Sequence, residues 1–441
     1  MTVEEYYADA AVQTRIREYA GGVAGGALTA AFLATLGPPS AAPLMWESAV
    51  RWPAPAFDGT WPGDADVVRS LRDRESLIFL LEVDYLNPDR PATPFFRSAE
   101  VFARLEPAYR AVRDALESYA VYPFVLMTGR GYHFTGRIPL GHPVIEDLAT
   151  IGESLPGWTP WMGLGCLIEY AAHRVMQSWD RTDLPLVFNG TVVGRGGEGR
   201  ECASLDFSYV GDPIDVRFVR TAFSAYQWHR LRPDLFGGAA ARLPPLVALP
   251  RGAHPLAAVL ERGRTLEAGR QLAHESSGGL PDVSPGITRL FADYRDSQLA
   301  QFHRHFHAGL RVAVPGPLPV DLPPCVMAGL STPNDLLLKP EHIQHLTRML
   351  LARGWPAARI ARLLQQTYDA DHHWGDRWTR RMNPAQRAQF DVRVFAGRVA
   401  TGTDSLVDFN CVSAQEKGLC PRATCTHDLR RDRARLELLR P

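Results

Sequence analysis

The sequence has little lysine, no long apolar run and no secretory signal. Lysine stands at only two positions, Lys339 and Lys417, among 48 basic residues, so contacts to phosphate would be made by arginine and its planar fork. No apolar run approaches the ~20 residues that a membrane-spanning helix needs. The acidic N-terminus has no basic region followed by an apolar core, so no secretory signal is visible. We therefore expect a cytoplasmic protein with no membrane partner.

An excess of charge of one sign is also absent, with 48 basic against 48 acidic residues. This balance argues against a protein whose whole surface wraps duplex DNA, but it leaves room for a local basic groove. The 441 residues are 46% hydrophobic and 22% charged, a composition typical of soluble globular proteins. A chain of this length predicts about two or three domains.

Helical and strand-like patterns alternate over the first half of the chain, which predicts an α+β fold with a mixed sheet. Helix is expected over residues 3–20, 97–120 and 290–307, and strand over Leu77–Val83, Phe124–Met127, Leu184–Val193 and Ala203–Tyr209. Segments rich in proline and glycine separate this half from helical spacing over residues 340–400. The expected division is 1–235, a linker and helical connector over 236–317, and a helical C-terminal domain over 318–441.

Two acidic residues end the apolar strand that begins at Leu77. Glu82 and Asp84 are two positions apart, so their carboxylates project from the same face of the strand. Two anions this close repel unless a cation lies between them, and hard oxygen ligands suit a divalent metal ion. The alternative is an exposed strand end with solvated acids.

A glycine-rich turn follows the strand at Phe124–Met127. It reads Thr128-Gly-Arg-Gly-Tyr-His133, and two glycines let the backbone turn sharply and approach a ligand. Main-chain N–H groups there, with Thr128, Arg130 and His133, would suit a polyphosphate. Most such turns, taken alone, belong to hairpins.

A third carboxylate, Asp206, ends another predicted strand. Asp212-Pro then signals a short helix that would carry Arg217 and Arg220 on one face. Asp206 would complete a two-metal site, and the arginines could hold phosphates. A solvated helix face explains the arginines as well.

The order of these elements is an acid-x-acid strand, a Thr-Gly-Arg-Gly-x-His strand, an apolar strand ending in Asp, and an Arg-x-x-x-Ser element. In this order the first half of the chain, residues 1–232, resembles the archaeo-eukaryotic primase superfamily, which includes the small catalytic primase subunit and the primase-polymerases. The resemblance implies that residues 1–235 form a primase-polymerase-like catalytic domain.

The resemblance also implies roles for individual residues. The metal-binding catalytic carboxylates would be Glu82, Asp84 and Asp206, with Mg²⁺ or Mn²⁺ as the ion. The nucleotide-binding residues would be Thr128, Arg130, His133, Arg220 and Ser224. The chain departs from the family pattern at Glu82, where Asp is commoner, and at Tyr226, where Ser-x-His is expected. The second departure weakens the assignment of Arg220 and Ser224.

These parts predict template-directed nucleotidyl transfer, in which the chain makes or extends primers on single-stranded DNA from nucleoside triphosphates by a two-metal mechanism. One alternative is a non-catalytic protein that binds single-stranded nucleic acid and retains the fold. Another is a repair polymerase that extends primers but does not start them. A helicase or another replication or repair protein is a further candidate partner.

Three of the six cysteines lie close together near the C-terminus, Cys411, Cys420 and Cys425. A metal site needs a fourth ligand, which could be His427 or Cys325. No Cys-x-x-Cys pair is present, which argues against a zinc ribbon. Buried thiols without a metal are the simple alternative.

The layout Pro-Pro-Cys325, a helical body and then Cys411, Cys420 and Cys425 resembles the C-terminal domain of the large primase subunit. That resemblance implies a [4Fe–4S] cluster held by the four cysteines, with Zn²⁺ as the alternative. The other two cysteines, Cys166 and Cys202, stand in apolar contexts and are expected in the core. The alternating His303, His305 and His307 fall in a predicted helix, where their spacing does not favour a shared metal.

Overall fold

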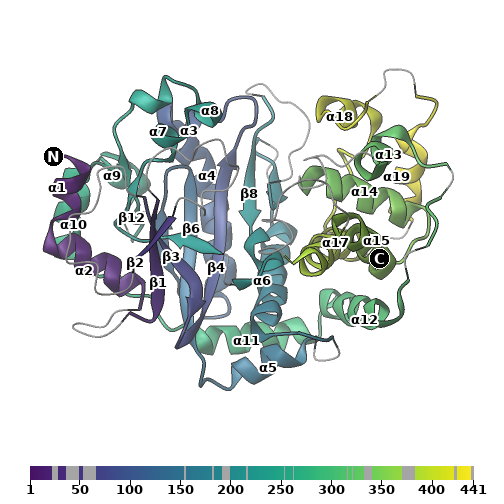
Figure 1. Cartoon of the computed structure of the whole chain (residues 1–441), viewed down its shortest axis with the longest axis horizontal. Coiled ribbons are helices and arrows are strands. Elements are labelled where there is room, and N and C mark those ends of the chain that lie inside the picture. The colour runs from purple at the N-terminus through teal and green to yellow at the C-terminus, as the bar shows by residue number, and fades with distance from the viewer. Residues whose placement is uncertain are drawn as a thin grey trace. The chain divides into compact units, whose positions relative to one another are not determined.

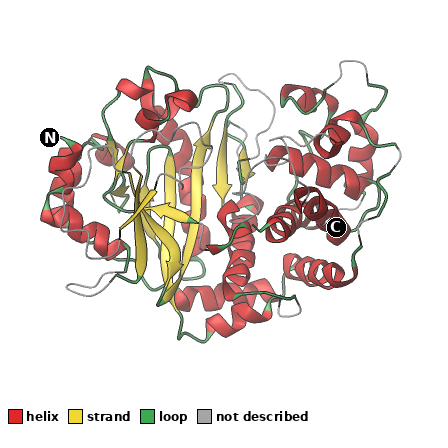
Figure 2. Ribbon diagram, in the orientation of Figure 1, coloured by secondary structure: helices red, strands yellow, loops and turns green. Residues whose placement is uncertain are grey.

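The structure is a computed structural model of the whole chain. It describes residues 1–21, 28–35, 49–52, 66–152, 155–180, 183–190, 199–214, 217–252, 254–261, 263–314, 316–319, 321–331, 340–369, 383–421 and 425–438. The fold is α+β, as predicted, and its strands pair in both antiparallel and parallel fashion (Figure 2).

The chain forms two compact units. The first comprises residues 1–142 and 217–287, and the second comprises residues 143–216 and 288–441. They differ from the three consecutive segments expected from the sequence because the chain returns to the first unit after residue 216. There β9 (Phe218–Arg220) pairs with β3 (Asp66–Asp73), and β12 (Leu249–Pro250) pairs with β5 (Phe124–Met127).

The strands of the first unit form antiparallel sheets. One has the order β2-β1-β3-β9, with β1 (Ala30–Thr35) and β2 (Ala49–Trp52). In the other, β4 (Ser76–Leu86), β6 (Gly131–Pro139), β5 and β12 are neighbours in that order. A short pair joins β10 (Ala225–Tyr226) to β11 (Leu246–Val247).

The helices of this unit are α1 (Val3–Tyr7), α2 (Ala10–Tyr19), α3 (Thr93–Phe96), α4 (Ser98–Glu117), α7 (Trp228–Leu231), α8 (Pro233–Phe236), α9 (Leu256–Glu261) and α10 (Leu266–Glu275). The long helix α4 packs against β4 and β6, and α10 lies beside α1 and α2 (Figure 1). Residues on both faces of β4 are buried, which explains why its sequence is apolar almost throughout.

The second unit is mainly helical. Its helices are α5 (Val144–Thr150), α6 (Pro160–Gln177), α12 (Gln298–Val312), α13 (Pro324–Ser331), α14 (Pro340–Ala352), α15 (Ala357–Asp369), α17 (Pro384–Ala400), α18 (Cys411–Glu416) and α19 (Leu429–Glu437), and α11 (Ser284–Arg295) begins in the first unit and ends in this one. A parallel pair joins β7 (Leu186–Phe188) to β8 (Cys202–Asp206). Among the described residues, no helix is long and apolar enough to cross a bilayer.

A buried polar cluster joins three helices of the second unit. Glu169 on α6 accepts a hydrogen bond from Arg393 Nε on α17 at 2.9 Å and lies 3.3 Å from His303 Nε2 on α12. Burial would raise the pKa of Glu169, but Arg393 and His303 outweigh it and lower the pKa to about 2. His305 is exposed while His303 and His307 are buried, so the predicted helical spacing holds and the three rings do not converge.

Two predicted helices are each split in the structure. The helix expected over 3–20 is divided at Asp9, whose carboxylate caps α2 by accepting from the N–H groups of Ala11 and Val12. The helix expected over 290–307 breaks where Ser297 caps α12. Of the strand expected over Leu184–Val193, β7 covers Leu186–Phe188, and Asn189 and Gly190 take positive φ directly after it. Residues 191–193 lie outside the described residues.

Candidate active site

The acidic end of β4 carries the two carboxylates on one face, as predicted. In the antiparallel register Glu82 lies opposite His133 of β6, and Asp84 lies opposite Gly131. Asp84 is 4% exposed, whereas the Glu82 side chain keeps 20% of its surface exposed. The residue between them, Val83, faces the other way and is fully buried.

The turn from Thr128 to Gly131 needs both of its glycines. The N–H group and the hydroxyl of Thr128 both donate to the carbonyl oxygen of Gly131, at 2.8 and 3.2 Å, and close the turn. A Cβ at Gly129 would lie 2.5 Å from the ring of Tyr226, and one at Gly131 would lie 2.0 Å from the carbonyl oxygen of Val83. Close approach, rather than an unusual φ, therefore accounts for these glycines.

This close approach brings the basic side chains of the turn onto the acids. Arg130 lies with Nε 2.9 Å and Nη2 2.7 Å from Asp84 Oδ2. His133 Nε2 lies 3.3 Å from Glu82 Oε1. Asp84 Oδ1 and His133 Nδ1 are buried and have no hydrogen-bond partner among the described residues.

Burial and neighbouring charges set the protonation of these groups. Burial lowers the pKa of His133 to about 4, helped by Arg220 and Arg130 and opposed by Asp84. His133 is therefore neutral near pH 7, and its contact with Glu82 is not an ion pair at that pH. Burial would lower the pKa of Arg130, but Asp84, Tyr226 and Glu82 together outweigh it and raise that pKa.

The segment that carries Arg220 is a strand, not the predicted helix. β9 hydrogen-bonds with β3, and Arg220 forms a buried ion pair with Asp66, with Nη2 2.8 Å from Oδ2. The Ser224 hydroxyl is buried and donates to the carbonyl oxygen of Thr221 at 2.9 Å. Arg220 comes near His133, but both residues have structural partners, and their contacts to a nucleotide stay a prediction.

Three residues around the site were missed in the sequence. Asp66 neutralises Arg220, and the ring of Tyr226 lies 4.2 Å from the Arg220 guanidinium carbon. The half-buried ring of Trp228 lies 5.7 Å from the guanidinium carbon of Arg130. Tyr226 could have been found as the departure from Ser-x-His, whereas nothing in the sequence around Asp66 or Trp228 signals a role.

The third predicted carboxylate belongs to the second unit. Asp206 is the last residue of β8, so the strand expected over Ala203–Tyr209 ends three residues early, where Ser208–Gly211 forms a 3-10 turn. Asp206 Oδ1 accepts from the N–H group of Ser208 at 2.8 Å. Its meeting with Glu82 and Asp84 stays a prediction. Within the part of the chain that the structure describes, no group of three or more His, Cys, Asp or Glu side chains is arranged to hold a metal ion.

The four cysteines of the predicted cluster all belong to the second unit, but within the described chain they are not arranged as a metal site. Cys325 lies on α13, Cys411 begins α18, and Cys420 and Cys425 follow in loops. Burial, together with the thiols of the other three cysteines, raises the pKa of Cys325 to about 12. Within the described chain, none of the four takes part in a disulfide.

Hydrogen-bonding groups surround these thiols. His345 Nε2 on α14 lies 3.2 Å from Cys325 Sγ, and the His427 N–H group lies 3.4 Å from Cys425 Sγ. Cys411 Sγ lies 3.8 Å from the carbonyl oxygen of His427. Cys166 and Cys202 are fully buried in the core, as predicted.

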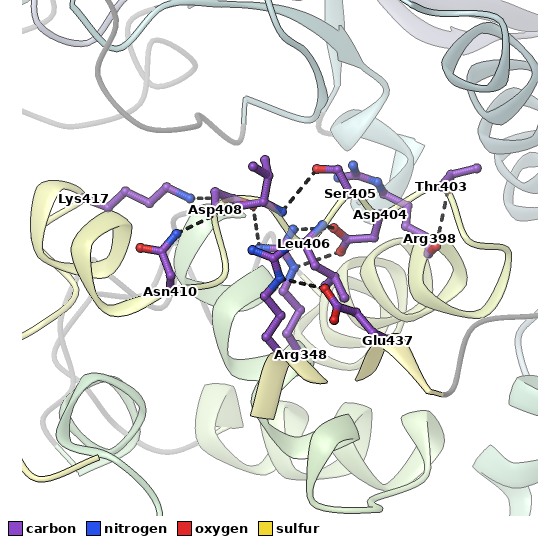
Figure 3. A network of polar contacts seen from close by, with 12 residues as sticks. Arg348, Arg398, Thr403, Asp404, Ser405, Leu406, Asp408, Asn410, Lys417 and Glu437 are labelled. Atoms are coloured by element: carbon purple, nitrogen blue, oxygen red, sulfur yellow. Dashed lines mark hydrogen bonds and ion pairs between the residues drawn. The ribbon is translucent and has the colours of Figure 1, made fainter. Parts of the chain in front are cut away.

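A buried network of ion pairs holds the loop before Cys411 (Figure 3). Arg348 of α14 binds both oxygens of Asp404, at 2.8 and 2.5 Å, and lies 3.1 Å from Asp408. Asp408 also pairs with Lys417 just beyond α18. These contacts fix residues on both sides of Cys411 against the helix that carries His345.

Comparison with solved structures finds a match to the polymerase domain of ligase D from Mycobacterium tuberculosis in complex with DNA. The match has a TM-score of 0.36 and 15% sequence identity, and it covers 66% of this chain and 91% of that one. No family model and no curated protein matches the sequence. A likeness of this size carries no argument about activity, which has to come from the geometry of the residues.

Proposed function

We propose that the chain is a template-directed nucleotidyltransferase that makes or extends primers on single-stranded DNA. The observation that carries the proposal is that two acids of β4 lie against two basic side chains at the start of β6. Asp84 contacts Arg130, just before β6, and Glu82 contacts His133 on β6. Acids that can hold cations and basic groups that can hold a triphosphate are the parts that phosphoryl transfer requires.

The acidic pair fits a divalent cation in its chemistry. Both residues offer hard oxygen ligands, and Asp84 Oδ1 is a buried carboxylate oxygen without a partner among the described residues. Glu82 and Asp84, joined by Asp206, would hold Mg²⁺ or Mn²⁺. A bound cation of this kind supplies charge stabilisation for the attacking hydroxyl and the departing pyrophosphate. In this arrangement Arg130 leaves Asp84 and turns to the triphosphate.

Primer extension on single-stranded DNA with Mg²⁺ or Mn²⁺ tests the proposal. Asp84→Asn and Glu82→Gln should abolish incorporation, whereas Glu75→Gln, an exposed acid just before β4, should keep it. Incorporation that survives in Asp84→Asn would reject the proposal. Supplying template without primer distinguishes an enzyme that starts chains from a repair polymerase that only extends them.

A second candidate is a binding protein without catalysis. It is favoured by the pairing of Asp84 with Arg130 and of Glu82 with His133, which leaves both acids engaged within the protein. This candidate predicts binding of single-stranded nucleic acid with no incorporation at any Mg²⁺ or Mn²⁺ concentration.

For the second unit we propose a [4Fe–4S] cluster on Cys325, Cys411, Cys420 and Cys425, with Zn²⁺ as the alternative. The neighbouring thiols, together with ring and main-chain nitrogens next to two of the sulfurs, suit a thiolate-bound centre. Anaerobically purified protein should be brown and contain iron. A colourless protein with stoichiometric zinc would reject the iron–sulfur assignment.

A further inference from the structure

Arg264, in the first unit, is a buried cation with no carboxylate against it among the described residues. It is 5% exposed, and its Nε, Nη1 and Nη2 atoms have no hydrogen-bond partner in that part of the chain. Four other arginines of this unit lie against a carboxylate: Arg69 against Asp73, Arg130 against Asp84, Arg220 against Asp66, and Arg251 against Glu106. Arg264 differs from these four arginines because no carboxylate of the described residues neutralises its charge.

A carboxylate on the same face of α4 is already in use. Arg264 lies over the ring of Phe102, with its guanidinium carbon 5.0 Å from the ring centre. One turn further along α4, Glu106 receives Arg251 Nη2 at 3.2 Å on one oxygen and the Tyr132 hydroxyl at 3.3 Å on the other. Arg110 Nε also lies 3.4 Å from Glu106. Three guanidinium groups therefore lie near this helix, and Glu106 pairs with the two that are not Arg264.

The charge on Arg264 persists at neutral pH in spite of its surroundings. Burial lowers its pKa to about 10, and Tyr132 and Tyr226 oppose this shift. The Phe102 ring gives the cation some attraction, but a ring compensates a buried guanidinium less completely than a carboxylate does. A position of this kind is explained when an external anion binds there.

We infer that Arg264 binds a phosphate group. A guanidinium fork matches the oxygens of a phosphate, and the only lysine in the described residues, Lys417, belongs to the other unit. Tyr226 connects the position to the turn at Gly129, since its ring lies against Gly129 and it raises the pKa of both Arg130 and Arg264. This inference is independent of the proposed activity.

The phosphate could come from the polyphosphate chain of a nucleotide or from the backbone of a single strand. Calorimetric titration without divalent metal, using inorganic tripolyphosphate in one arm and a single-stranded oligonucleotide in the other, distinguishes the two sources. Arg264→Met should weaken binding about 10- to 100-fold in the arm that supplies the group. Arg270→Met, an exposed arginine on α10, is the matched control and should bind as the wild type does.

Thermal unfolding without ligand gives a second measurement. If Arg264 is a binding residue, Arg264→Met removes a buried charge that no carboxylate of the described chain compensates, so the variant should be at least as stable as the wild type. If Arg264 is only a structural cation over Phe102, the variant loses stability, and the protein that remains folded binds both ligands as the wild type does. That pair of results, or wild-type affinity in both arms, would overturn the inference. Incorporation assays on the same proteins report separately on the proposed activity.

Discussion

Arg130 directs two of its nitrogens, Nε and Nη2, at a single oxygen of Asp84, Oδ2, while Oδ1 of the same carboxylate is buried and has no hydrogen-bond partner in the described chain. One carboxylate thus offers one oxygen to a resident cation and keeps the other available for coordination. If the acid also binds a metal ion, the arginine and the metal compete for it, and each should replace the other in stabilising the fold.

Arg130→Met tests this competition. Removing the arginine leaves Asp84 buried without a countercharge and should cost about 2–4 kcal/mol of unfolding free energy at pH 7 without metal, discounted for the partial exposure of Arg130. Mn²⁺ should recover most of this loss. Denaturant unfolding with and without Mn²⁺ measures both effects.

The matched control is Arg251→Met, which removes the buried one of the two arginines that pair with Glu106 on α4 of the same unit and leaves the exposed Arg110. It should also lose stability, but Mn²⁺ should not restore it, because Glu106 lies apart from the acidic pair. If Mn²⁺ stabilises both variants to the same degree, the metal is not acting at Asp84.

The pH dependence of stability should report His133. An unfolded histidine titrates near 6.5, whereas burial lowers the pKa of His133 to about 4 in the folded chain. Between these values the unfolded chain binds a proton that the folded chain does not, so stability is present above about pH 6.5 and falls as the pH falls.

From pH 7 to pH 5 the wild type should therefore lose about 2 kcal/mol more than His133→Gln. Denaturant unfolding at the two pH values measures the difference, in which the contributions of the other buried histidines cancel. His305→Gln, an exposed histidine on α12, serves as control and should lose as much as the wild type. Equal losses in the wild type and His133→Gln would show that His133 is protonated in the fold.

The placement of the acidic pair could be predicted because it depends on short-range geometry. Alternation along β4 places Glu82 and Asp84 on one face whatever the rest of the fold does, and two glycines in four residues signal a close approach. The pairing of Arg130 with Asp84 depends instead on the β4–β6 register, which joins residues far apart in the sequence. The alternation of side chains along each strand does not determine which residues of the two strands lie opposite one another.

The helix predicted around Arg220 failed for a similar reason. Asp-Pro and the i, i+3 arginines favoured a helix locally, but residues Phe218–Arg220 add as a strand to the edge of β3, and Asp66 of β3 holds Arg220. Tertiary pairing thus outweighed the local signal. The cluster predicted on Cys325, Cys411, Cys420 and Cys425 needed no register to be noticed, because cysteine is rare in this chain, and it stays a prediction.

Gly131→Ala tests whether close approach is what the turn requires. The new Cβ would lie 2.0 Å from the backbone carbonyl oxygen of Val83 and 2.5 Å from Asp84 Oδ1, so β4 and β6 would have to move apart. A cost of about 1–3 kcal/mol is expected from such overpacking. Gly141→Ala is the control, since no described residue comes within 4 Å of the position that its Cβ would take, and its stability should be unchanged. Comparable losses in the two variants, measured by chemical denaturation, would mean that the contact at Val83 relaxes at little cost.

Trp228 is the residue of the site that best suits contact with a base. Its ring is half-buried, lies 5.7 Å from the guanidinium of Arg130, and is held on α7 next to the aromatic group of Phe236, at 6.2 Å. Stacking of a base on an aromatic side chain is worth about 1–3 kcal/mol. If the proposed function holds, Trp228→Ala should therefore weaken nucleotide or single-strand binding about 5- to 100-fold, and Trp228→Phe should retain most of it.

Tyr122→Ala removes an exposed aromatic side chain from the same unit and should have little effect. Fluorescence titrations would decide the matter, because wild-type affinity in Trp228→Ala would place the base elsewhere, whereas a selective loss would connect the ring beside Arg130 to the strand or nucleotide that the acidic pair acts on.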